Sequence, residues 1–171
     1  MLVFDLDPGP GVDIVGCCEI GLVLRGMFEQ LGLQTFAKTS GSKGLQLYLP
    51  LNEEGATYER TKPFALEIAE LLERQLPDKV VSRMTKSIRK GRVLIDWSQN
   101  DPHKTTVCAY SVRAKAEPTV STPVTWDEVE TCLEAGDADR LRFTTAQVLE
   151  RIERHGDLFA PVVSCVQRLP A

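Results

Sequence analysis

Two aspartates near the start of the chain could bind a metal ion. Asp5 and Asp7 stand two positions apart at the end of a short apolar run. Side chains at positions i and i+2 of a strand project from the same face, so these carboxylates would repel each other unless a cation lay between them. Mg²⁺ and Mn²⁺ prefer oxygen ligands of this kind. A strand end with Asp-Pro-Gly turn chemistry is the alternative interpretation.

Asp96 is a third acidic residue with the same requirement. It lies between Ile95 and Trp97 in an apolar segment, where an unpaired buried charge is expensive. A metal ion shared with Asp5 and Asp7 would neutralise it, and an arginine or lysine partner is the alternative. We predict that the three aspartates are metal ligands.

Residues 39–44 could bind phosphate. The segment reads Thr-Ser-Gly-Ser-Lys-Gly and joins two predicted strands. Glycines allow backbone N–H groups to converge on an anion, and Lys43 adds a positive charge. The glycine spacing differs from that of the strand-to-helix P-loop. The same residues also suit an ordinary turn.

A basic run precedes Asp96. Residues 83–92 contain five cations and no acid, which suits either a solvated helix face or a patch that faces phosphate. Together with the acidic positions and the glycine-lysine loop, the run completes the parts of a phosphoryl-transfer site. In such a site metal ions clamp the phosphates, cations neutralise the developing charge, and a hydroxyl attacks in line.

These residues need strands to present them and helices to support the strands. Apolar patterning predicts strands over 2–6, 34–39, 45–51, 93–97 and 106–112, with a hairpin between the second and the third. Helical spacing predicts one helix over 13–31 with Asp13 as its N-cap, and another from Pro63 at its first position to about Leu76.

Two later helices are predicted from their caps. Thr125 and Thr144 each begin a capping box, and Gly156 suits the end of the last helix. The order of the elements contains no internal repeat and no linker. We therefore expect one α+β domain over residues 1–171, with a mixed or antiparallel sheet flanked by helices.

The composition excludes several classes of protein. With 171 residues, 43% of them hydrophobic and 26% charged, the chain suits a globular domain with a real core. No apolar run approaches the ~20 residues that cross a bilayer, and the N-terminus lacks the pattern of a signal peptide, so we expect a cytoplasmic protein with no membrane partner. Five cysteines without a C-x-x-C pair indicate reduced thiols. The net charge of −4 argues weakly against a dedicated nucleic-acid binder.

Three segments carry a resemblance to a known family. Residues 4–9, 38–45 and 93–100 resemble the three motifs of the polymerase domain of bacterial ligase D, within the archaeo-eukaryotic primase superfamily. Residues 104–106, 110–114 and 119–126 are also similar to that domain. The resemblance runs in order over nearly the whole chain, and it implies the fold of a primase-polymerase catalytic core.

The resemblance implies a template-dependent nucleotidyltransferase that extends primers and fills gaps in non-homologous end joining. Its cofactors would be two Mn²⁺ or Mg²⁺ ions, and its partners NTP or dNTP, DNA ends or primer-template, Ku and a ligase or nuclease module in the nucleoid. By position, the catalytic metal ligands would be Asp5, Asp7 and Asp96. The nucleotide and triphosphate-binding residues would be Ser40, Gly41, Ser42, Lys43, Gln46, Arg89, Gln99 and Arg113.

Two departures from the family pattern affect these expectations. The family often has histidine where this chain has Gln46, which keeps a donor but cannot become charged. In addition, Met1 lies only four residues before Asp5, whereas a substantial segment with substrate contacts precedes this motif in the relatives. We expect a chain truncated at its N-terminus relative to the family, as a fragment, a mis-started reading frame, or a minimal or split polymerase.

Two other functions suit parts of the pattern. In a phosphatase of the haloacid dehalogenase type, Asp5 would be the nucleophile and Asp7 the acid and base. The usual threonine or valine soon after the second aspartate is absent, however. A non-catalytic module or split subunit that binds nucleotide, DNA ends or a repair partner is the other alternative.

Overall fold

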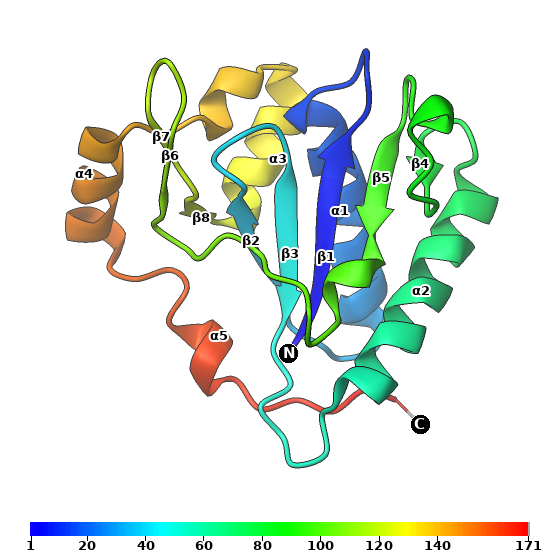
Figure 1. The fold of residues 1–171 in the computed structure, drawn as a ribbon. Coiled ribbons are helices and arrows are strands. Elements are labelled where there is room, and N and C mark those ends of the chain that lie inside the picture. Colours follow the sequence, from blue (N-terminus) through cyan, green and yellow to red (C-terminus); the bar gives the residue numbers. More distant parts are fainter. Residues whose placement is uncertain (171) are drawn as a thin grey trace.

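The computed structural model describes residues 1–170, which form a layered structure around one central sheet (Figure 1). Six strands take part in the order β4-β5-β1-β3-β2-β8. Every neighbouring pair is antiparallel except β4 and β5, so the predicted α+β class with a mostly antiparallel sheet is confirmed. The strands are β1 (Leu2–Pro8), β2 (Phe36–Thr39), β3 (Leu45–Leu49), β4 (Val80–Val81), β5 (Val93–Asp96) and β8 (Pro123–Val124).

Helices cover one face of this sheet, and a two-stranded ribbon stands beside its other edge. In Figure 1, α1 lies behind the sheet and α2 runs along its β4–β5 edge. The helices are α1 (Ile14–Gln30), α2 (Tyr58–Gln75), α3 (Trp126–Ala135), α4 (Thr145–His155) and α5 (Pro161–Ser164). Short 3₁₀ helices are η1 (Lys86–Ile88), η2 (Trp97–Gln99) and η3 (Ala138–Leu141). The ribbon pairs β6 (Val112–Arg113) with β7 (Thr119–Val120).

The core lies between β1 and the helices. Leu2, Phe4 and Leu6 are fully buried on one face of β1, and Phe28 of α1 packs against Phe4 with ring centroids 5.7 Å apart. Because strand side chains alternate, this burial turns the odd-numbered positions of β1 to the opposite face. Asp5 and Asp7 therefore lie on the face that α1 leaves uncovered.

Local signals in the sequence give the helix starts. The Asp13 side chain accepts a hydrogen bond from the backbone N–H of Val15 at 2.9 Å, as an N-cap should. Both predicted capping boxes are formed, at Thr125 and Thr144, and Gly156 follows the last residue of α4. The predicted hairpin is present as β2 and β3, with somewhat shorter strands.

Two predicted elements are wrong. The helix expected to begin at Pro63 begins at Tyr58, so Pro63 lies inside α2. One missing backbone hydrogen bond is tolerated there because Thr61, Ala65, Ala69 and Leu72 bury a continuous stripe of the helix. The strand expected over 106–112 reduces to β6, and residues 105–107 instead line a cavity over the open face of the sheet.

All five cysteines are free thiols, and three of them, Cys17, Cys18 and Cys132, are buried. Burial raises the pKa of the Cys17 and Cys18 thiols, so both act as small apolar groups in the core. Within residues 1–170, no helix has the length and apolar character needed to span a membrane.

Candidate active site

A row of polar side chains crosses the open face of the sheet. Asp5 on β1 is paired in register with Gln46 on β3 on one side and with Asp96 on β5 on the other. Gln46 in turn is paired with Lys38 on β2. Side chains opposite each other on neighbouring strands share a face and lie ~5 Å apart. Lys38, Gln46, Asp5 and Asp96 are therefore direct neighbours, with Asp7 one step further along β1.

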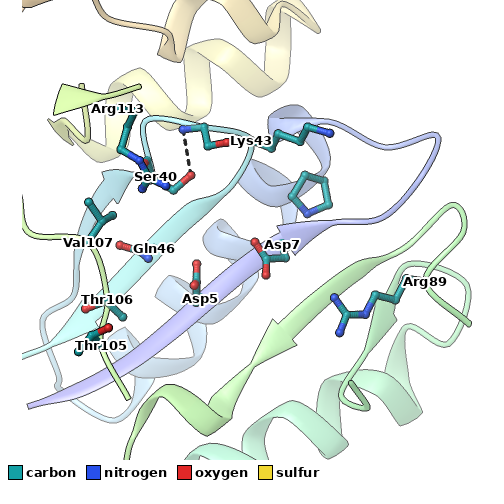
Figure 2. Close-up of a pocket in the computed structure, with 12 residues that line it drawn as sticks. Asp5, Asp7, Ser40, Lys43, Gln46, Arg89, Thr105, Thr106, Val107 and Arg113 are labelled. Carbon is teal, nitrogen blue, oxygen red and sulfur yellow. Dashed lines mark hydrogen bonds between the residues drawn. The ribbon is translucent and has the colours of Figure 1, made fainter. Parts of the chain in front are cut away.

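A cavity of about 590 Å³ opens above this row (Figure 2). Its walls come from β1, β3, the loop between β2 and β3, the turn after η1, and the segments that lead into β6. Figure 2 shows Asp5 and Asp7 side by side along β1 at its floor. Of the predicted site residues, the structure brings eight to this cavity: Asp5, Asp7, Ser40, Ser42, Lys43, Gln46, Arg89 and Arg113. Gly41, Asp96 and Gln99 lie outside its lining.

The two carboxylates on the floor are electrostatically unfavourable as they stand. Burial and, after it, the negative charge of Asp7 together raise the pKa of Asp5 to about 7, although hydrogen bonding to Gln46 lowers it. Burial also raises the pKa of Asp7, together with repulsion from Asp96. Oδ1 of Asp5 is buried and has no hydrogen-bond partner among residues 1–170. An orphaned buried oxygen beside a second carboxylate suits a divalent cation, which would supply the missing partner.

Asp96 is held differently from the other two. Its side chain is 8% exposed, and its Oδ1 accepts hydrogen bonds from the backbone N–H and the hydroxyl of Ser98 at 2.9 and 2.6 Å. Its Oδ2 accepts from Nε2 of Gln99 at 2.9 Å. Asp96 thereby caps η2, and Gln99, expected beside the nucleotide, holds the Asp96 carboxylate.

The structure does not bring all three aspartates together as a ready-made metal site. Within residues 1–170, no group of three or more histidine, cysteine, aspartate or glutamate side chains is placed to hold a metal ion. Two carboxylates are nevertheless enough where a substrate completes the coordination, because Mg²⁺ is commonly bound by one or two carboxylates together with phosphate oxygens. Asp5 and Asp7 meet that requirement.

The glycine-lysine loop is held tightly by close backbone contacts. Ser40 Oγ accepts hydrogen bonds from the backbone N–H groups of Ser42 and Gly44 at 3.2 and 3.1 Å. Gly41 has a φ of +65°, and a Cβ there would lie 2.6 Å from the backbone nitrogen of Ser121. These constraints explain why glycine occupies position 41. The exposed side chain of Lys43 lies at the edge of the cavity and lines it (Figure 2).

Two arginines reach the cavity from opposite sides. Arg113 of β6 donates from Nη1 to the backbone carbonyl of Ser40 at 3.0 Å, which anchors it to the loop. Arg89 donates from Nη2 to the backbone carbonyl of Met84 at 2.6 Å and lowers the pKa of Asp7. The basic run over 83–92 is thus a loop around η1 rather than a helix face, and it packs against the turn at Gly9.

Sequence reasoning missed Lys38 and the segment 105–107. Lys38 is fully buried, and its Nζ donates to Gln46 Oε1 at 2.5 Å and to Ser121 Oγ at 2.7 Å. Burial lowers the pKa of Lys38 to about 8, although the charge of Asp5 raises it. The available signal was a lysine in a short strand, Phe36–Thr39, that contains no acid to pair with it. Residues 105–107 carry no such signal, because only the course of the chain brings them over the cavity.

Comparisons with known proteins show which family the chain resembles. Residues 1–159 match the model of the family described as LigD, primase-polymerase domain. The "Multifunctional non-homologous end joining protein LigD" of Mycolicibacterium smegmatis is 44% identical over 161 residues, which cover 94% of this chain and 20% of that protein. The bifunctional LigD of Bacillus subtilis is 32% identical, over 91% of this chain and 24% of that protein.

A solved structure is similar over the same region. The polymerase domain from Mycobacterium tuberculosis ligase D, in complex with DNA, superposes with a TM-score of 0.86 at 42% identity. The match covers 97% of this chain and 55% of that one. The chain therefore spans about a fifth of the length of the curated relatives and about half of the solved polymerase domain.

Proposed function

Because the chain belongs to the family of LigD primase-polymerase domains, we propose that it transfers nucleotides to a primer on a DNA template. The substrates are NTP or dNTP and a gapped or overhanging DNA end, and the reaction serves non-homologous end joining. One observation carries the proposal. Two desolvated carboxylates on β1 face Lys43, Arg89 and Arg113 across a single cavity large enough for a nucleotide.

The residues of the cavity divide the work of the reaction. Asp5 and Asp7 would hold divalent cations, Mn²⁺ or Mg²⁺, with Asp96 as the neighbouring third carboxylate. Bound ions of this kind polarise phosphoryl oxygens and make the attacking hydroxyl more acidic. The 3′-hydroxyl of the primer loses its proton to solvent, and its oxygen forms the new ester bond to the α-phosphorus while the bond from that phosphorus to the leaving pyrophosphate breaks. Lys43 and Arg113 lie on the loop side of the cavity, where they balance the negative charge of the leaving group.

The proposed role in end joining also implies partner proteins and a location. Ku and a ligase or nuclease module are the expected partners, in the cytoplasm at the nucleoid. The phosphatase alternative finds no support, because β1 is antiparallel to both neighbours and the family match spans the acidic strand. A module that binds nucleotide or DNA ends without extending them stays a second candidate, favoured by the way Ser98 and Gln99 hold Asp96.

Primer extension tests the proposal directly. The purified chain is incubated with Mn²⁺, each NTP or dNTP and a gapped template, in parallel with Asp5→Asn and Asp78→Asn. Asp78 is exposed and lies away from the cavity, so its variant is the matched control. We expect extension by the parent and by Asp78→Asn, and a loss of roughly a thousandfold or more in Asp5→Asn. Equal extension by all three would contradict the mechanism, and nucleotide binding without extension would favour the second candidate.

A further inference from the structure

Lys38 is a buried charge that the proposed reaction does not yet use. Its side chain is 0% exposed, and the two hydrogen-bond acceptors of its ammonium, Gln46 Oε1 and Ser121 Oγ, are both neutral. The ring of Tyr48 lies beside it, with Nζ 5.7 Å from the ring centroid. Removing a lysine from water without a carboxylate partner is costly, so an apolar residue would be the simpler choice at this position.

The contacts of Lys38 determine which way the Gln46 amide points. Gln46 Oε1 accepts from Lys38 Nζ at 2.5 Å, and the hydroxyl of Tyr48 lies 3.2 Å from the same oxygen and 3.3 Å from Thr106 Oγ1, either of which can accept its proton. An ammonium group only donates, so the amide NH₂ of Gln46 cannot face Lys38. The amide therefore has one allowed orientation, with its NH₂ turned toward Asp5, the register partner of Gln46 on β1 (Figure 2).

The other side of Lys38 is oriented by the backbone. Ser121 Oγ donates to the carbonyl of Thr39 at 2.9 Å, which leaves the lone pairs of the hydroxyl free to accept from Lys38. Each hydrogen bond in this row therefore has a fixed direction. Ser121 donates to the Thr39 carbonyl, and Lys38 donates to both Ser121 and Gln46. Such a chain of buried donors and acceptors is rigid when all of its members are satisfied.

We propose that Lys38 is a positioning residue, which keeps the amide NH₂ of Gln46 directed at Asp5 and the cavity by holding its carbonyl oxygen. The expected effect on catalysis rests on the proposed function, whereas the orientation of the Gln46 amide does not depend on it. A fixed donor beside Asp5 limits the rotation of that carboxylate and leaves Oδ1 for a cation. Without Lys38, the amide could reverse and present its oxygen to Asp5, which would repel the carboxylate.

A double-variant cycle tests whether Lys38 acts through Gln46. Lys38→Met keeps the length of the side chain and removes the charge, Gln46→Ala removes the amide, and the third variant combines both. We expect Lys38→Met to weaken Mn²⁺ binding and to lower kcat/KM for extension by about tenfold, as the loss of an outer partner of a metal ligand does. In the Gln46→Ala background the same substitution should have no further effect, because its target is gone.

The side-chain amide of Gln46 provides a readout that does not depend on activity. Its ¹⁵N–¹H₂ signals, assigned by their loss in Gln46→Ala, should be sharp in the parent and broadened or shifted in Lys38→Met. Lys79→Met is the matched control, because Lys79 is exposed and paired only with Glu19 at the surface. If the parent neither extends primers nor binds Mn²⁺, the proposed function fails, and the amide signals still decide the orientation.

Two outcomes would overturn the inference. One is that Lys38→Met binds Mn²⁺, extends primers and shows the Gln46 amide signals as the parent does. The other is that the losses in kcat/KM of Lys38→Met and Gln46→Ala multiply in the combined variant, which would show that the two residues act independently. Should Lys38→Met lack a cooperative thermal transition, Ser121→Ala replaces it, because Ser121 is the other partner of Nζ. The same cycle with Gln46→Ala then applies, with an expected loss of about threefold that disappears in the combined variant.

Discussion

The surroundings of Asp5 favour a bound cation over an ionised carboxylate without one. Its raised pKa of about 7 means that the folded state binds a proton more tightly than the unfolded chain, whose aspartates titrate at about 3.9. The contribution of Asp5 to the free energy of unfolding is therefore highest below about pH 4 and is lost as the pH rises through about 7. A metal ligand must be ionised near neutral pH, whereas the metal-free protein is more stable when Asp5 is protonated, so function and stability make opposite demands on this residue.

Replacing this carboxylate should stabilise the metal-free protein. At pH 8 without divalent ions, we expect Asp5→Asn to raise the free energy of unfolding by about 1–3 kcal/mol, because the amide carries no charge to desolvate or to repel Asp7. The gain should shrink as the pH falls and vanish near pH 4. Thermal unfolding from pH 4 to 8 measures it, with Asp78→Asn as control. Mn²⁺ should raise the Tm of the parent but not that of Asp5→Asn; an equal rise in both would place the ion elsewhere.

Lys43 should matter for substrate binding and not for folding. Its side chain is exposed and lines the edge of the cavity, so we expect Lys43→Ala to leave the Tm unchanged and to raise the KM for the nucleotide roughly tenfold. Steady-state extension at varied nucleotide concentration checks this. Arg154→Ala on α4, also exposed, removes a cation away from the cavity and should behave as the parent. An unchanged KM in Lys43→Ala would remove Lys43 from the phosphate site.

At the level of elements, one side chain joins the two acidic strands. Asn100 follows η2 and is 2% exposed. Its Oδ1 accepts from the backbone N–H of Val3, and its Nδ2 donates to the carbonyls of Val3 and Trp97, each at 2.8 Å. Asn100 thus continues the backbone pairing of β1 after β5 has ended, which keeps Asp96 and η2 close to Asp5.

Asn100→Asp should loosen this connection. The new side chain cannot donate to either carbonyl and buries a charge, so we expect a loss of about 3 kcal/mol in the free energy of unfolding. Extension should also fall, measured well below the Tm. Thr144→Ala is the comparison, because it removes the capping box of α4 at about 1 kcal/mol and leaves the site untouched. The same loss of extension in both variants would show that stability alone explains the effect.

At the level of the whole molecule, charge distribution matters more than net charge. The chain carries −4 overall, yet residues 83–92 contain three exposed cations, Arg83, Lys86 and Lys90, on the same loop as Arg89, which lines the cavity. An acidic protein can therefore present a positive rim to a nucleic-acid backbone. The open face of the sheet and this rim together are the surface on which we expect DNA to lie.

The strength of DNA binding should depend on salt through this rim. We expect the affinity for a gapped duplex to fall as salt rises, and Lys86→Ala with Lys90→Ala to reduce the slope of log K against log [salt] by about 1–2, since each lost phosphate contact removes about 0.9. Fluorescence anisotropy over a salt series measures the slope. Arg140→Ala with Arg154→Ala removes the same charge elsewhere and should leave the slope unchanged. Equal slopes in all three proteins would place the DNA on another face.

Local rules in the sequence determined the parts of this protein that depend on near neighbours. The i, i+2 spacing of Asp5 and Asp7, the N-cap at Asp13 and the capping boxes at Thr125 and Thr144 involve residues a few positions apart, and their geometry follows from backbone periodicity. The hairpin of β2 and β3 is local in the same sense.

Only the tertiary structure decided which distant residues meet. The register that places Asp96 beside Asp5 comes from pairing strands far apart in the chain, as does the approach of Ser121 to Lys38. Burial of α2 overrode the usual position of Pro63, and the path of residues 105–107 over the cavity depends on packing on both sides. The acidic pair Asp5 and Asp7 was visible in the sequence. The position of Lys38 beside it was not, because cross-strand register is a property of the whole sheet and not of any one segment.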